Sequence, residues 1–344
     1  MFKHNGVRNI FSLAIAGIVA SAIASSIIKN RNNIAQAQEK PKVVASHNVI
    51  CDLVTTIAED TLDLTCLIDD NQDPHTYSPT PSQRKAIEEA QLIFYGGYQL
   101  EPKVINLLEA TDNKIPRIAL YEQVVTEPLV SEHEHEEHSE AEAGHDHEQE
   151  SESESAKSEP ELEADPHVWH NIENTVAMVE AIESTLLQVN PQAAELYLVN
   201  STALTDQLWQ LDAWIDEQIA TIPAGQRVLF TTHDSLNYYA QAYYLEDYRT
   251  LQGLSSSVSP TASQVRKLSA EIKQAGVPTI FTESTQNDRV INNVARIANV
   301  ELSPEKLYVD GLGQAENYTE MMSHNTCAIV NGLGGKCKPF AAKN

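Results

Sequence analysis

Short apolar runs alternate with longer segments of helical period along most of this chain. Runs rich in β-branched and aromatic residues predict buried strands at residues 43–45, 62–68, 92–95, 117–120, 227–231 and 279–282. Between them, segments such as residues 81–90 and 262–275 repeat apolar side chains with a helical period. Strands that alternate with helices form mainly parallel sheets. We therefore predict an α/β fold.

A helix-rich region separates the strands of the two halves. Residues 171–189 have a helical pattern, and Asn190-Pro191 then opens a segment with no further Gly or Pro before Pro223. A helix of some 30 residues would be roughly 45 Å long, which is more than a small lobe needs. We predict one long rigid helix at residues 191–222, and a kinked pair of ordinary helices is the alternative. It would join an N-terminal α/β lobe, residues 38–190, to a C-terminal lobe, residues 223–344.

The N-terminus has the parts of a secretory signal peptide. Lys3 and Arg8 precede an apolar run at residues 10–28, and Ala35-Gln36-Ala37 has the small-x-small pattern that signal peptidase cuts. We predict a signal peptide at residues 1–37 and a periplasmic location. The apolar run is near the minimum length of a membrane span, so a retained anchor is the alternative. No cysteine follows it closely, which argues against a lipid-anchored start.

Acidic residues dominate the charge of the chain, whose formal net charge is -26. Nucleic acid is therefore an unsuitable partner. Much of the charge lies in one segment of low complexity, residues 127–164, which we predict to be a loop inserted in the N-terminal lobe. Its carboxylates alternate with five histidines, namely His133, His135, His138, His145 and His147. Neutral imidazoles in a negative field predict weak, multiple cation binding, and a solvated loop without a functional role is the alternative.

The four cysteines fit an oxidising compartment, and none belongs to a CxxC pair. Their proximity in sequence suggests that Cys51 pairs with Cys66 and Cys327 with Cys337. Four cysteines allow three connectivities, and buried free thiols remain an alternative.

Three histidines and one aspartate form the candidate metal site. His75 and His233 follow predicted strands, where ligands gather in open α/β sheets, and His167 lies in a second Asp-Pro-His turn. Asp310 follows a short apolar run. Three imidazoles and a carboxylate suit tetrahedral zinc. Glu283, at another strand end, is an alternative fourth ligand or a partner that orients an imidazole.

Several motifs occur in a fixed order along the chain. They are Asp73-Pro74-His75-Thr76-Tyr77-Ser78-Pro79, Tyr95-Gly96-Gly97-Tyr98-Gln99-Leu100-Glu101, Asp165-Pro166-His167-Val168-Trp169, Tyr197 with Asn200, His233-Asp234-Ser235-Leu236-Asn237-Tyr238-Tyr239-Ala240 and Phe281-Thr282-Glu283. In order, spacing and chemical type they resemble the metal-binding solute-binding proteins of ABC transporters, the cluster A-I or cluster 9 group. The resemblance covers essentially the whole chain after residue 37.

The resemblance implies two (β/α) lobes joined by a rigid helix, a metal site in the cleft between them, and delivery of the metal to a membrane permease. The family's ligands correspond to His75, His167, His233 and Asp310. The chain departs from the family pattern at Ser78, at His170-Asn171-Ile172 and at Gly311. His170 is consequently a possible competitor for the metal, and the departure at Gly311 weakens the correspondence at Asp310.

We therefore expect a monomeric, non-enzymatic protein that captures Zn²⁺ outside the cytoplasmic membrane for an ABC transporter. Manganese-binding relatives resemble this chain but have a carboxylate at the position of His233, so manganese is the first alternative. The histidine-rich loop resembles that of the zinc branch of the family. A zinc-dependent hydrolase is a second alternative, although the chain has no HExxH motif. A metal-independent adhesin on the same fold is a third.

Overall fold

The computed structural model describes residues 39–111, 114–132 and 162–342. The described residues from Pro41 onward form one compact unit, which contains every helix and strand described below. The predicted signal peptide, residues 1–37, and the five loop histidines His133, His135, His138, His145 and His147 lie outside the described residues.

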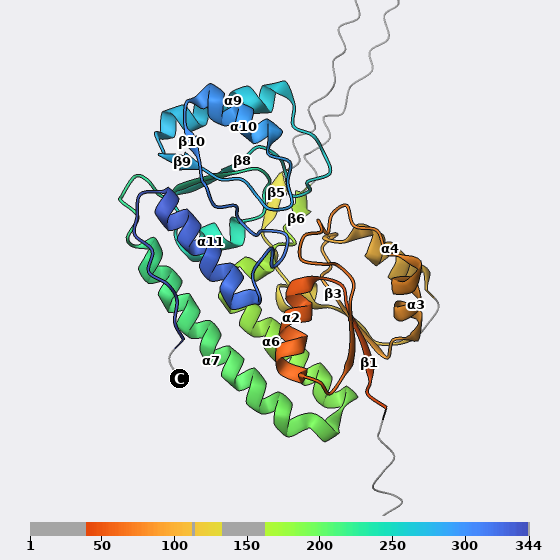
Figure 1. The fold of residues 1–344 in the computed structure, drawn as a ribbon. Coiled ribbons are helices and arrows are strands. Elements are labelled where there is room, and N and C mark those ends of the chain that lie inside the picture. Colours follow the sequence, from red (N-terminus) through yellow and green to blue (C-terminus); the bar gives the residue numbers. More distant parts are fainter. Residues whose placement is uncertain (1–38, 112–113, 133–161, 343–344) are drawn as a thin grey trace, which may run out of the picture. The chain divides into compact units, whose positions relative to one another are not determined.

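A parallel four-stranded sheet occupies the first part of this unit (Figure 1). Its strands have the order β2-β1-β3-β4, and they are β1 (Lys42–Ala45), β2 (Asp63–Cys66), β3 (Leu92–Tyr95) and β4 (Arg117–Ala119). The side chains of β1 alternate between two cores, as the pleat requires. Val43 and Ala45 enter a large core, and Val44 enters a smaller one on the other face. The connecting helices are α2 (Asn48–Ala58), α3 (Pro81–Glu89), α4 (Pro102–Ala110) and α5 (Leu120–Val124).

One long helix packs on elements from both ends of the chain. This helix, α7 (Ala194–Ile219), has 26 residues, which corresponds to roughly 39 Å. It contacts α2, α6 (Ile172–Val189) and α11 (Tyr318–Gly332) (Figure 1). The prediction of one continuous helix is confirmed, and the kinked pair is excluded. Its first turn differs from the prediction, because η2 (Pro191–Ala193) is 3-10 helix and the Asn190 side chain bonds Tyr197 instead of capping the helix.

Two pairs of parallel strands form the sheet region of the second half. Strand β7 (Val228–Thr231) pairs with β8 (Asp247–Thr250), and β9 (Thr279–Ile280) pairs with β10 (Glu301–Leu302). A hydrogen bond from Phe281 N to Phe230 O, 2.9 Å long, joins the two pairs. The helices of this half are α8 (Asn237–Ala242), α9 (Ala262–Ala275) and α10 (Arg289–Ala298), besides α11. Parallel strands with helices confirm the predicted α/β class.

The acidic segment, predicted to be a loop throughout residues 127–164, contains a short strand near each end. Strand β5 (Val130–Glu132) pairs antiparallel with β6 (Leu162–Ala164), so residues 127–164 begin and end in a small ribbon. A strand of three residues is too short for its alternation to be recognised in sequence.

Both expected disulfides are present. Cys51 in α2 pairs with Cys66 in β2, and Cys327 in α11 pairs with Cys337 near the C-terminus. Among the described residues, no helix combines the length and apolar character that crossing a bilayer requires.

Candidate metal centre

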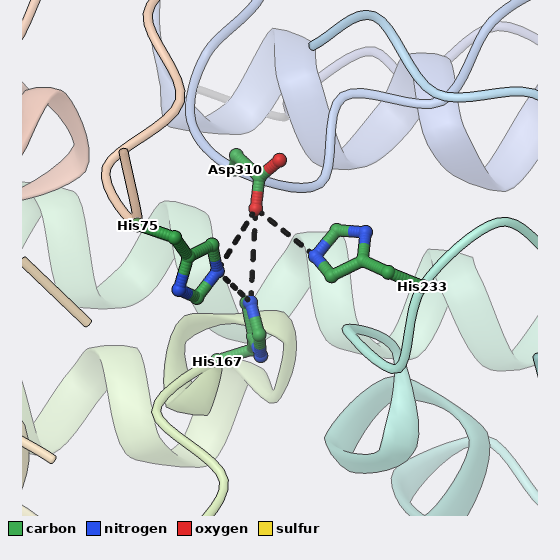
Figure 2. Close-up of side chains that lie close together, drawn as sticks. All are labelled: His75, His167, His233 and Asp310. Carbon is green, nitrogen blue, oxygen red and sulfur yellow. Dashed lines mark hydrogen bonds and ion pairs between the residues drawn. The ribbon is translucent and has the colours of Figure 1, made fainter. Parts of the chain in front are cut away.

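Four side chains from separate segments meet in one cluster (Figure 2). His75 lies in the turn that follows β2, and His167 directly precedes η1 (Val168–His170). His233 lies two residues after β7, and Asp310 follows the parallel bridge between Glu283 and Leu307. One ligand atom from each of the four lies within 4.8 Å of the others. The structure thus brings together all four residues that the sequence nominated as ligands.

The spacing of these atoms suits a small tetrahedral ion. His75 Nε2 and His167 Nε2 are 3.3 Å apart. Asp310 Oδ1 lies 3.6 Å from His75 Nε2, 3.7 Å from His167 Nε2 and 3.2 Å from His233 Nε2. Zinc bonds of about 2.0–2.1 Å in a tetrahedron would separate the ligand atoms by roughly 3.3 Å.

The cluster is closed to solvent and contains polar atoms without hydrogen bonds. His167 and His233 are fully buried, and Asp310 and His75 are 1% and 7% exposed. His233 Nε2 and Asp310 Oδ1 are buried without a hydrogen-bond partner among the described residues. Such orphan groups are uncommon in folded proteins and require an explanation. A cation between them would supply the missing interaction.

Two buried carboxylates orient two of the imidazoles. Asp165 Oδ1 lies 2.8 Å from His167 Nδ1, and Glu283 Oε2 lies 2.5 Å from His233 Nδ1. Each arrangement places the proton on Nδ1 and leaves the Nε2 lone pair toward the centre of the cluster. Glu283 Oε1 also accepts the backbone N–H groups of Thr232 and His233. Both oxygens of Glu283 are therefore engaged outside the cluster, in the orienting arrangement that was one of its two predicted roles.

The electrostatics of the cluster favour cations. Burial alone would raise the pKa of Asp310, but the three imidazoles outweigh it and hold this pKa well below its ordinary value. Burial alone would lower the pKa of His233. The neighbouring carboxylates of Glu283 and Asp310 outweigh burial and raise this pKa well above its ordinary value. The pKa of His75 is lowered, chiefly by burial. The lowered pKa of Asp310 and the raised pKa of His233 mean that the carboxylate and a positive charge beside it stabilise each other, and a bound metal ion would take the place of the protons.

His170, which the sequence offered as a competitor, does not belong to the cluster. Its Nε2 lies 2.9 Å from the carbonyl oxygen of Val309. Burial lowers the pKa of His170 to about 3, so the ring is neutral and its Nε2–H donates. The ring therefore supports the backbone beside Asp310.

His47 supports the next carbonyl group, and the sequence analysis missed it. Its Nε2 lies 3.0 Å from Asp310 O, and its Nδ1 lies 2.7 Å from the Tyr121 hydroxyl. Burial lowers the pKa of His47 to about 4, which keeps this ring neutral as well. A single histidine before a helix has no recognisable sequence motif. Its contact with Asp310, 263 positions along the chain, is visible only in the folded structure.

The absence of a side chain at Gly311 has a steric explanation. Its φ is 152°, and a Cβ atom there would lie 2.5 Å from the Asn48 side-chain nitrogen. A residue with a side chain would therefore displace either Asn48 or the turn that carries Asp310.

Comparisons with known proteins agree with this geometry. The profile of the family described as zinc-uptake complex component A, periplasmic, matches residues 43–332. This chain belongs to that family. It is a substrate-binding protein of a metal ABC transporter, and its relatives are metal-binding transport components. The resemblance that the motifs carried is thereby confirmed.

Individual relatives differ in the metal that they are named for. The manganese-binding lipoprotein MntA of Halalkalibacterium halodurans is 26% identical over 327 residues, which cover 94% of this chain and 98% of MntA. The manganese transporter lipoprotein PsaA of Streptococcus mitis is 28% identical over 335 residues, 94% of this chain and 97% of PsaA. The structure of the periplasmic zinc-binding protein TroA from Treponema pallidum has a TM-score of 0.73 and 27% identity, and the match covers 86% of this chain and 99% of TroA.

Proposed function

We propose that this protein captures Zn²⁺ outside the cytoplasmic membrane and delivers it to the permease of an ABC transporter. His75, His167, His233 and Asp310 bind the ion as cargo. The observation that carries this proposal is a buried four-donor cluster whose Asp310 Oδ1 and His233 Nε2 have no hydrogen-bond partner among the described residues.

The donor set supports zinc over manganese. Imidazole nitrogen suits zinc, whereas additional carboxylate, carbonyl or water oxygens favour manganese. The cluster offers three nitrogens and one carboxylate, and Glu283 is engaged with His233. The manganese alternative draws its support from relatives named for that metal, such as MntA and PsaA.

Transport is supported over catalysis by the number of protein ligands. Catalytic zinc sites keep one position open for water or substrate, whereas four protein donors complete a tetrahedron. A cavity of about 690 Å³ lies beside the cluster, and His75 is the ligand that lines it. We assign this cavity as the route by which the ion enters.

Several predictions from the sequence remain part of this proposal. The signal peptide at residues 1–37 exports the chain, and the lobes comprise residues 38–190 and 223–344 with residues 191–222 between them. His133, His135, His138, His145 and His147 add weak binding sites. The protein acts as a monomer beside its permease.

A competition titration tests the proposed cargo. Metal-free protein spanning residues 38–344 is equilibrated with Zn²⁺ and Mn²⁺ together, and the bound metals are quantified by mass spectrometry. We expect one tightly bound zinc per chain and its loss in the variants His75→Ala, His167→Ala and His233→Ala. The variant His324→Ala is the matched control and keeps the tight site, because His324 lies outside the cluster and bonds the carbonyl oxygen of Lys306. A preference for Mn²⁺ in the unmodified protein would establish the manganese alternative.

A further inference from the structure

The carboxylate of Asp310 is the one donor of the cluster that can offer either one or two oxygen atoms. With one oxygen the four residues supply four donors, and with two they supply five. Structural zinc sites are almost always four-coordinate, whereas manganese prefers more oxygen donors in octahedral sites. The number of oxygens that Asp310 presents therefore bears directly on the choice of metal.

The two oxygens of Asp310 have different surroundings. Oδ1 faces the three imidazole nitrogens at 3.2–3.7 Å. Oδ2 accepts a hydrogen bond from the hydroxyl of Thr285, which follows β9 and Glu283 in the sequence. Figure 2 shows this second oxygen directed away from the imidazoles. One carboxylate oxygen thus faces the imidazoles, and the other is held toward Thr285.

The backbone that carries the carboxylate is also held. His170 and His47 donate to the successive carbonyl oxygens of Val309 and Asp310. Gly311 packs against the Asn48 side chain. Because the two successive carbonyl groups are held by hydrogen bonds, rotation of the side chain is the easier movement for the carboxylate, and the Thr285 hydroxyl opposes that rotation.

We propose that Thr285 is a specificity-determining residue, whose hydrogen bond holds Asp310 Oδ2 away from the imidazoles and so leaves the carboxylate a single donor oxygen. The inference deepens the proposed zinc function and rests on it. Without the hydroxyl, Oδ2 loses its partner, and the bound cation becomes its most favourable replacement. The site then gains a fifth, oxygen donor and accepts manganese more readily.

The variant Thr285→Val tests this role because valine has nearly the same shape and lacks the hydroxyl. The variant Thr285→Ser keeps a hydroxyl. Thr232→Val is the control for a buried threonine beside the site, since the Thr232 hydroxyl has no hydrogen-bond partner among the described residues. Each variant is titrated with Zn²⁺ and Mn²⁺ in competition, and each is also loaded with Co²⁺ for visible spectroscopy. Four-coordinate Co²⁺ absorbs much more strongly than five- or six-coordinate Co²⁺.

We expect Thr285→Val to shift the Mn²⁺/Zn²⁺ affinity ratio about tenfold toward manganese. Removing a residue that supports a metal ligand usually changes metal affinity by about 10–100-fold, and this expectation is the lower end of that range. The cobalt absorption of Thr285→Val should weaken, whereas Thr285→Ser and Thr232→Val should match the unmodified protein. An unchanged ratio and unchanged cobalt spectrum in Thr285→Val would overturn the inference. If that variant does not fold, Thr285→Ala is measured in its place and judged by the same two results.

The two proposals fail in different ways. A manganese preference in the unmodified protein would contradict the proposed zinc function. The proposed role of Thr285 is judged by the change in the Mn²⁺/Zn²⁺ affinity ratio and in the cobalt spectrum between Thr285→Val and the unmodified protein. If neither changes, this role is refuted. The cobalt spectrum measures coordination independently of which metal the unmodified protein prefers.

Discussion

Replacing Glu283 with glutamine should weaken zinc binding although Glu283 does not belong to the cluster. The carboxylate accepts the N–H groups of Thr232 and His233 on Oε1, at 2.9 and 3.0 Å, and faces His233 Nδ1 with Oε2, at 2.5 Å. A glutamine side chain has nearly the same shape, but one of its two terminal atoms is an NH₂ donor.

Either orientation of the amide disturbs the site. If its oxygen accepts the two backbone N–H groups, the NH₂ group donates to His233 Nδ1, and the ring proton moves to Nε2, the atom that must bind the metal. If the amide is turned round, its NH₂ group faces the two N–H donors instead. Loss of such an orienting partner typically costs 10–100-fold in metal affinity, which is about 1.4–2.7 kcal/mol.

The assay is zinc titration of metal-free protein against a series of chelators at pH 7.5. The control is Glu101→Gln, because Glu101 is equally buried, does not belong to the cluster, and accepts hydrogen bonds from Ser46 and the backbone of Gly96. We expect the control to retain unmodified affinity. Zinc binding by Glu283→Gln within threefold of the unmodified protein, in a folded variant, would refute the argument that this carboxylate sets the tautomer of His233.

Three further predictions concern selectivity, stability and the acidic segment. In His233→Glu, an oxygen replaces a nitrogen donor, so competition with both metals should show a shift from zinc toward manganese, and an unchanged ratio would argue against His233 as a ligand. Burial raises the pKa of Asp52 to about 6, although the hydrogen bond from the Tyr318 N–H opposes the shift. Because the unfolded chain ionises this carboxyl at about pH 4 and the folded chain only at about pH 6, the folded state loses stability as the pH rises through that range. In urea unfolding of metal-free protein, Asp52→Asn should therefore gain about 1–2 kcal/mol at pH 7.5 and almost nothing near pH 4, and a gain that is equal at both values would contradict the pKa. Deletion of residues 133–159 should remove the weak zinc sites and leave one tight site in calorimetry, because the loop histidines are lost and the cluster is retained; loss of the tight site would reverse this assignment.

The candidate ligands could be nominated from sequence because their positions follow from local patterns. The strand runs are apolar enough to be recognised, and ligands gather beyond the carboxyl ends of parallel strands. His75 and His233 therefore stood out, and the second Asp-Pro-His turn marked His167. The long helix was equally visible, since an uninterrupted helical period over α7 needs no knowledge of what it packs against.

The roles of neighbouring polar groups depend on contacts that no local pattern contains. Glu283 was one of two candidates for the carboxylate ligand, and its contact with His233, 50 residues away, distinguishes it from Asp310. The contacts of His47 and Thr285 with Asp310 span 263 and 25 residues. Sequence periodicity reports which face of an element is buried, whereas the partner of a buried hydrogen bond is decided by how separate elements pack. For this protein, the chain's own pattern determined the fold class and the candidate donor residues, and the tertiary structure alone decided which polar groups contact them.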